Sequence, residues 1–171
     1  VWGTPKNLRA PVNSAAWESL PSLSFDGKQI YFSSNRPGGF GGKDIWVTTF
    51  EDNKFTEPVN LGPTINTEYD EDAPLIHQDN QTLYFSSSGW PGMGSNDLFY
   101  SRKDENGNFT APVNMGYPIN TSGDERSFHI SRSGKKAFIS SSRLGGFGGV
   151  DIYSFQLYKE AQPVPTSYVK G

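Results

Sequence analysis

Short hydrophobic runs separated by polar turns recur three times along the chain. The second copy contains four such runs, each bounded by turn residues: 72–77, 82–87, 96–101 and 109–114. Runs of this length with Gly, Pro, Asn or Asp at their ends are typical of β-strands. No segment carries a sustained helical period. The pattern therefore predicts four short antiparallel strands in each copy.

The spacing of the copies predicts how the strands are assembled. Asp44, Asp97 and Asp151 each open the third strand of a copy, and they stand 53 and then 54 residues apart. A fixed period of this length indicates a repeat architecture in which neighbouring units bury a shared core. A β-sandwich does not need so strict a period, and the repeats of a β-helix are much shorter. The predicted fold class is all-β, with four-stranded β-propeller blades.

The two ends of the chain predict an arc of blades. The predicted boundaries are a propeller segment at 1–158 with an outer strand at 6–13, units at about 14–60, 61–114 and 115–157, and a linker or the start of a following β-domain at 159–171. Three blades are fewer than the four to eight of a usual ring. We therefore expect an arc cut from a larger propeller. The alternative is a homodimer in which two copies close a six-bladed ring.

Composition agrees with this fold and narrows the function. The chain of 171 residues contains 12 Phe, 8 Tyr, 4 Trp, 19 Gly and 12 Pro, as expected for aromatic strands joined by tight turns. A net charge of −3 argues against a nucleic-acid partner. No apolar run is long enough to span a bilayer. Cysteine is absent, so disulfides and thiolate metal sites are excluded, and no cofactor is predicted.

The residues of the repeat resemble a known family. In the first copy Glu18 is followed by Asp-Gly-Lys at 26–28, an aromatic strand, Ser-Asn-Arg at 34–36 and Asp-Ile-Trp at 44–46. This pattern recurs over residues 18–157 and resembles the WD-like repeat of TolB-type β-propellers. The Gly-Gly-Phe-Gly-Gly loops, at 38–42 and 145–149, are similar to those of OmpA-family (PorE-like) envelope proteins of Bacteroidetes-type bacteria.

The resemblance implies a function in the cell envelope. It implies a periplasmic, outer-membrane-associated scaffold that binds other envelope proteins and performs no catalysis in the propeller. It also implies a link to a peptidoglycan-binding or secretion-associated protein. A carbohydrate-binding or glycan-processing propeller is the alternative, and it would need aromatic residues and paired carboxylates on one face.

Three sets of repeated polar residues are candidates for a site. Asp44, Asp97 and Asp151 are predicted to be structural anchors that accept N–H groups of the Gly-rich loops. Glu18, Glu71 and Glu125 are expected near the central channel, where they would bind a cation or basic peptide, or form hydrogen bonds between blades. Arg36 and Arg143 would pair with a carboxylate of the next blade or bind an anionic partner.

The second copy differs from its sisters in one loop. Trp90, with Pro91 and Met93, lies there in place of the polar sequence of the sister loops, and it either anchors a protein or sugar partner or packs on the adjacent blade. Asp70–Asp72 is the densest acidic cluster, and calcium prefers such ligands, but the spacing of a dedicated calcium loop is missing. His77 and His129 lack a clear third ligand, so no metal site is predicted.

Overall fold

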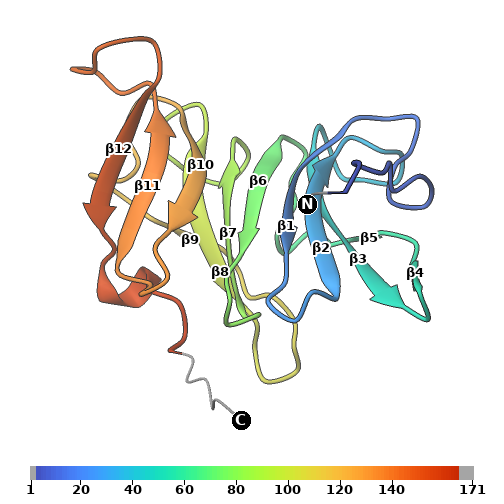
Figure 1. Cartoon of the computed structure of the whole chain (residues 1–171). Helices are drawn as coiled ribbons and strands as arrows, with labels where there is room; N and C mark the ends of the chain where they lie inside the picture. The colour runs from blue at the N-terminus through green and yellow to red at the C-terminus, as the bar shows by residue number, and fades with distance from the viewer. Residues whose placement is uncertain (1–2, 166–171) are drawn as a thin grey trace.

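The computed structural model describes residues 3–165 as three antiparallel sheets that follow one another along the chain (Figure 1). The first sheet contains β1 (Glu18–Leu23), β2 (Gln29–Ser34), β3 (Asp44–Glu51), β4 (Lys54–Phe55) and β5 (Val59–Asn60). The second contains β6 (Glu71–Ile76), β7 (Thr82–Ser87), β8 (Asp97–Arg102) and β9 (Val113–Asn114). The third contains β10 (Glu125–Ile130), β11 (Lys136–Ser141) and β12 (Asp151–Gln156), and the short 3-10 helix η1 (Lys159–Ala161) follows it.

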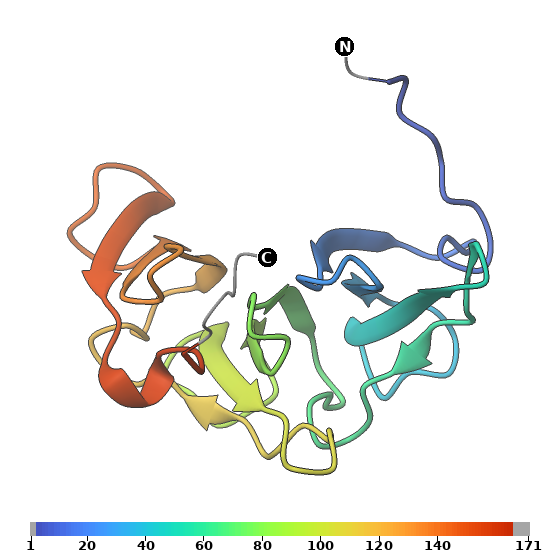
Figure 2. The ribbon, with the colours of Figure 1, turned by 60° about the horizontal axis from the view of Figure 1, so that its bottom comes forward.

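The three sheets are blades of a propeller, which confirms the predicted fold class. Figure 2 shows them side by side in an open arc, with β1, β6 and β10 innermost. Each innermost strand has a bulge whose central residue has positive φ: Leu20, Ala73 or Ser127. Such bulges bend and twist a strand. The three bulges line one small cavity at the centre of the arc.

The hydrophobic core is divided into two clusters, each lying between neighbouring blades. Tyr31 and Ile45 of the first blade pack with Leu83 and Phe85 of the second. Tyr84, Leu98 and Tyr100 of the second blade pack with residues of the third: Ile119, Phe128, Ala137 and Ile139. Aromatic and branched side chains fill these spaces well because they stand out from pleated sheets. The apolar side chains of both clusters are therefore buried by packing between neighbouring blades.

The outer strands differ from the sequence prediction. Residues 6–13 form no strand, and a turn occupies residues 10–12. The same turn recurs at 63–65 and 117–119 before the first strand of the other two blades, so residues 10–12 are the turn that precedes β1. The run 109–114 is reduced to β9 because Pro112 has no N–H to donate to a ladder.

The segment after β12 packs against the blades. The Tyr84 hydroxyl donates to the carbonyl of Ala161 at 2.6 Å. Arg102 Nη2 donates to the carbonyls of Glu160 and Gln162, at 2.6 and 2.7 Å. The first part of the predicted linker is therefore fixed on the second blade. Residues 166–171 lie outside the described part of the chain, and a following β-domain stays a prediction.

Candidate functional site

The candidate residues lie at one end of the blades. The strand register pairs Glu71 with Ser87 and Ser87 with Asp97, and the other two blades repeat this arrangement. We call this the upper end, which is at the top of Figure 1. The Gly-rich loops between the second and third strands also lie there. The repeated polar residues predicted from the sequence thus lie together at one end of the blades, although they form separate networks in each blade.

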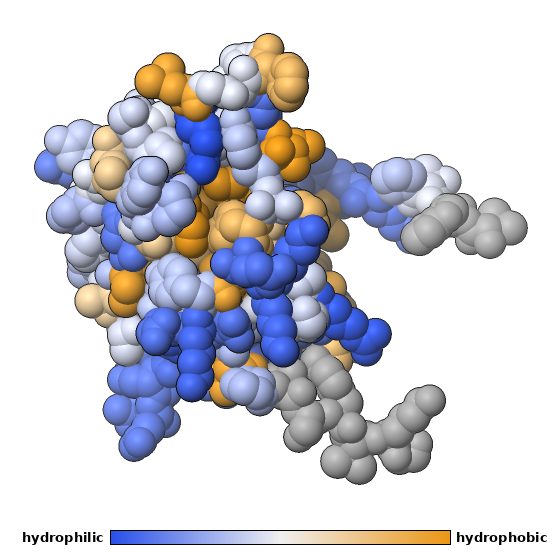
Figure 3. Space-filling view, turned by 90° about the vertical axis from the view of Figure 1, so that its left-hand side faces the viewer, coloured by the Kyte–Doolittle hydropathy of each residue, from blue (hydrophilic) through white to orange (hydrophobic). Residues whose placement is uncertain are grey.

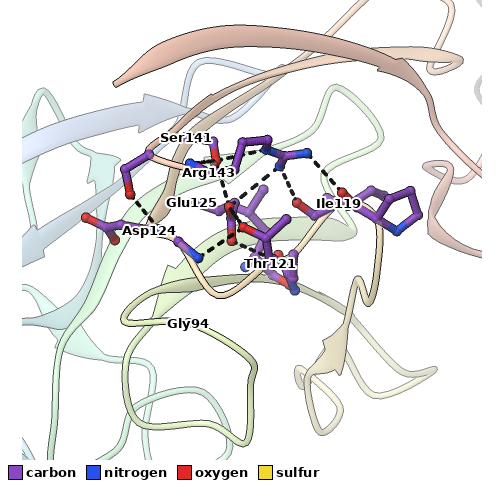
Figure 4. A network of polar contacts seen from close by, with 12 residues as sticks. Gly94, Ile119, Thr121, Asp124, Glu125, Ser141 and Arg143 are labelled. Atoms are coloured by element: carbon purple, nitrogen blue, oxygen red, sulfur yellow. Dashed lines mark hydrogen bonds and ion pairs between the residues drawn. The ribbon is translucent and has the colours of Figure 1, made fainter. Parts of the chain in front are cut away.

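The glutamates hold the segment that enters each blade. Glu125 is fully buried, and its carboxylate accepts the N–H and the hydroxyl of Thr121, at 2.9 and 2.7 Å (Figure 4). It also accepts the Ser141 hydroxyl at 2.7 Å, and Arg143 lies 3.6 Å away. Glu71 is equally buried and makes the corresponding bonds to Thr67 and Ser87. These two carboxylates therefore face protein groups.

The pKa values of Glu18 and Glu71 shift in opposite directions. Burial raises the pKa of Glu71 more strongly than the hydrogen bonds from Ser87 and Thr67 lower it. Burial also acts on Glu18, but hydrogen bonds from Ser14 and Ser34 and the charge of Arg36 outweigh it, so the pKa of Glu18 is lowered. The carboxyl group of Glu71 is therefore harder to ionise than usual, and that of Glu18 is easier to ionise.

The arginines pair within their own blade, so the predicted contact with the next blade is wrong. Arg36 Nη2 lies 3.1 Å from Glu18 Oε1 and donates to the carbonyl of Val12 at 2.5 Å. Arg143 Nη2 donates to the equivalent carbonyl of Ile119 at 2.7 Å. The planar guanidinium suits this task because it donates in several directions from one rigid group.

Trp90 takes over one of these bonds in the second blade. Its indole Nε1 donates to the carbonyl of Ile65 at 2.8 Å, and Ile65 stands where Val12 and Ile119 stand in the other blades. Trp90 is half-buried and packs against the core between the first two blades. The structure thus gives this residue a contact within the chain. A direct contact with a partner stays a prediction.

The aspartates fix the tips of the Gly-rich loops. Asp44 Oδ2 accepts the N–H of Phe40 at 2.7 Å, and Asp97 Oδ2 accepts that of Met93 at 2.7 Å. Asp151 accepts the N–H of Phe147 at 2.8 Å. Burial raises the pKa of Asp44 despite the hydrogen bonds that it accepts. One carboxylate in each blade thus holds the backbone of the fourth residue before it.

The residues held in this way are hydrophobic and exposed. Phe40, Met93 and Phe147, which we call the tip residues, have exposed fractions of 50%, 53% and 107%. Each follows a glycine whose Cβ, if it had one, would lie 1.9–2.0 Å from the anchoring carboxylate. The repeated polar pattern did not point to the tip residues. The available signal was a large apolar residue between glycines in a loop, where it cannot join a core.

The acidic cluster at 70–72 contacts a lysine of the chain, and the two histidines line a small cavity. The Lys43 ammonium donates to Asp72 at 2.5 Å and lies 3.7 Å from Asp70, so a cation of the chain already sits among these carboxylates. His77 is buried and accepts the Asp79 N–H at 3.2 Å. His77 and His129 line one small cavity. Residues 3–165 contain no group of three or more His, Cys, Asp or Glu placed to hold a metal.

Known structures with this arrangement include TolB proteins. No family model and no curated protein matches the chain. A protein assigned as TolB from Agrobacterium tumefaciens has a TM-score of 0.61 and 19% identity, over 95% of this chain and 52% of that one. TolB from Acinetobacter baumannii has a TM-score of 0.60 and 15% identity, over 91% and 33%.

An enzyme shares the architecture more distantly. The alpha-L-arabinofuranosidase from Lactobacillus brevis has a TM-score of 0.50 and 13% identity, over 96% of this chain and 61% of that one. The chain thus spans about half or less of the TolB structures and more of the enzyme. No helix among the described residues is long and apolar enough to cross a membrane. Identities this low establish the fold alone: the chain has a TolB-like β-propeller fold.

Proposed function

We propose that this chain is a non-catalytic interaction module whose upper end docks a protein partner through the tip residues. The observation that carries the proposal is the repeated pairing of a buried or half-buried aspartate with an exposed apolar side chain in each of the three blades. An aspartate that merely closed a loop would not need an apolar residue at the tip. Presentation of such side chains is a recurrent use of loops on rigid scaffolds.

Fixed loop tips favour binding energetically. An aromatic side chain contributes large contact area, and binding costs little additional ordering of a backbone that is already held. Phe147, Leu144 and Tyr117 are exposed at 107%, 95% and 78% on the loops of the third blade. A partner with a complementary apolar surface would remove these side chains from water.

The location and partners are proposed from the repeat and the fold neighbours together. The two TolB structures share the fold, and the repeat resembles TolB-type envelope propellers. We infer a periplasmic, outer-membrane-associated protein whose partners are other envelope proteins. A link to a peptidoglycan-binding or secretion-associated protein belongs to the same proposal. Arg36, Arg143, Trp90 and the three glutamates would act in it by positioning the loops.

The glycan-processing alternative has one supporting observation, the likeness to an arabinofuranosidase. Acid–base hydrolysis of a glycoside requires two carboxyl groups that reach the sugar from either side. Glu71 and Glu125 are fully buried and bonded to hydroxyl and N–H groups of the chain. They would have to exchange these partners to reach a substrate, so the interaction module is favoured.

Site-specific photo-crosslinking tests the proposal. A benzophenone amino acid would replace Phe40 or Phe147 in the chain exported to the periplasm of its own bacterium. Val59 would serve as the control because it is also apolar and exposed, but lies on the outer strand β5. We expect a discrete protein adduct from each tip position and none from Val59. No adduct at either tip, or the same adducts from Val59, would refute docking at the upper end.

A further inference from the structure

The two junctions between blades share one hydrogen-bond clamp. The Asn66 Oδ1 accepts the N–H of Ile45 at 2.8 Å, and its Nδ2 donates to the carbonyl of Ile45 at 3.0 Å. Asn120 holds Leu98 in the same way, at 2.8 and 2.9 Å. Both asparagines are buried. The second and third blades thus each bind the third strand of the preceding blade through one side-chain amide.

A second contact accompanies each clamp. The N–H of Glu71 donates to the carbonyl of Lys43 at 2.7 Å, and the N–H of Glu125 donates to that of Asn96 at 2.9 Å. In each case the acceptor directly precedes the anchoring aspartate. These bonds join the first strand of one blade to the loop of the preceding blade, and they complete the polar part of the junction.

The first blade has, on its uncovered side, the residues that form one side of such a junction. Asn13 occupies the position of Asn66 and Asn120, but it is half-buried and its Nδ2 donates to Asn7 Oδ1 at 3.0 Å. Beside it lies a groove of about 130 Å³ with a mainly apolar lining: Leu8, Val12, Pro21, Ile30 and Phe32. In the second and third blades, the equivalent region receives the core side chains of the preceding blade.

The third blade carries the other half. Ile152 occupies the position of Ile45 and Leu98, which are 0% and 1% exposed, yet it is 81% exposed itself. Val150, at the position of Lys43 and Asn96, is exposed as well. Figure 3 looks onto this side of the molecule, where hydrophobic side chains gather. The outer surface of β12 therefore has the chemistry of a junction and no blade covering it in residues 3–165.

We propose that a second copy of this chain docks residues 11–18 onto β12, head to tail, so that two copies close a six-bladed ring. In each junction the Asn13 amide would clamp the N–H and carbonyl of the second copy's Ile152. The N–H of Glu18 would donate to the carbonyl of the second copy's Val150. The Ile152 side chain would enter the apolar groove beside Asn13.

Both halves of the contact on one chain favour a second copy as the occupant. Head-to-tail contacts form closed rings when the rotation per copy allows it, and open filaments when it does not. Two copies of three blades give six, within the range of four to eight that propellers use. In such a ring the two junctions are identical by symmetry, and each repeats the pattern of the two internal junctions.

The mass of the chain in solution tests the proposal, measured by light scattering from low to high micromolar concentration. We expect a mass of two chains. Asn13→Ala should weaken the dimer about tenfold for each junction, because it removes the clamp. Ile152→Asp should leave single chains, since it places a charge in the groove. Val59→Asp, on an outer strand away from both edges, should leave the dimer intact.

Circular dichroism of Ile152→Asp separates dissociation from unfolding. The side chain is exposed in the single chain, so the variant should keep the β-sheet spectrum and a cooperative thermal transition. A mass of one chain for the unaltered protein at the highest concentration would overturn the proposal. So would a ladder of larger masses, or a two-chain mass that Asn13→Ala and Ile152→Asp leave unchanged. None of these results depends on the tip residues.

Discussion

Removal of an internal clamp gives the sharpest test of how the blades are joined. In Asn120→Ala the N–H of Leu98 loses its acceptor in a position that is 1% exposed. The carbonyl of Leu98 keeps a partner, because it also accepts the N–H of Met115 at 3.0 Å. An orphaned buried donor costs about 1–3 kcal/mol. The lost amide leaves a small cavity that adds about 1 kcal/mol. The expected loss is thus roughly 2–4 kcal/mol, or a Tm lower by roughly 5–12 °C.

Asn66→Ala and Asn13→Ala serve as comparisons because they remove the equivalent asparagine in the other two blades. Asn66 has the same environment as Asn120, so Asn66→Ala should lower the free energy of unfolding by a similar amount. Asn13 is half-buried and bonds to an exposed side chain, so its replacement should change the free energy of unfolding by less than about 0.5 kcal/mol. Urea unfolding followed by tryptophan fluorescence, at low protein concentration, measures all three. Equal effects at the three positions would refute a clamp that acts only where a preceding blade is present.

Two further predictions concern a loop glycine and a buried carboxylate. A Cβ at Gly92 would lie 1.9 Å from Asp97 Oδ2, so Gly92→Ala should cost about 1–3 kcal/mol by urea unfolding, whereas Gly149→Ala, with open space around it, should be near neutral. A loss at position 149 as large as that at 92 would contradict this. Burial raises the pKa of Asp79, but the neighbouring His77 side chain and hydrogen bonds from Thr82 and Gln81 outweigh it and lower the pKa below its ordinary value. A lowered folded-state pKa stabilises the protein above the unfolded pKa, and this contribution is lost as the pH falls through the folded-state value. The advantage of the unaltered chain over Asp79→Asn in urea midpoint should therefore be constant near neutral pH and shrink below about pH 4; an advantage that persists unchanged in acid would contradict the assignment.

Much of the fold could be predicted because two signals mark each strand in the sequence. One is the hydrophobic run itself, and the other is the pair of turns that bound it. The runs 82–87 and 96–101 correspond to β7 (Thr82–Ser87) and β8 (Asp97–Arg102) within one residue. The outer strands were less predictable. Residues 11–13 have the same Pro-Val-Asn as 58–60 and 112–114, yet 10–12 form the turn that precedes the first strand of each blade. A local pattern records a preference for the strand, and tertiary contact decides whether the strand forms.

The site was only half predictable. Carboxylates at a fixed period pointed to anchors, and the aspartates do accept loop N–H groups. What they hold was missed, because a lone Phe or Met in a glycine loop has no period of its own. The asparagine clamp was missed for a different reason. Asn66 and Asn120 lie outside the predicted strands, and their hydrogen bonds reach across 21 or 22 residues to another blade.

In a repeat protein, the internal junctions show which partner an uncovered repeat position can bind. At an internal junction both sides of the contact are visible, so the partner that each residue requires is known from the structure. Asn13 and Ile152 occupy the same repeat positions, but within residues 3–165 no blade covers them, and Asn13 is half-buried and Ile152 exposed. The groove beside Asn13 and the uncovered face of β12 therefore specify a blade with an Asp-Ile-aromatic third strand on one side and an asparagine clamp on the other. Because this chain carries both, self-association requires no residue beyond those that already join its own blades.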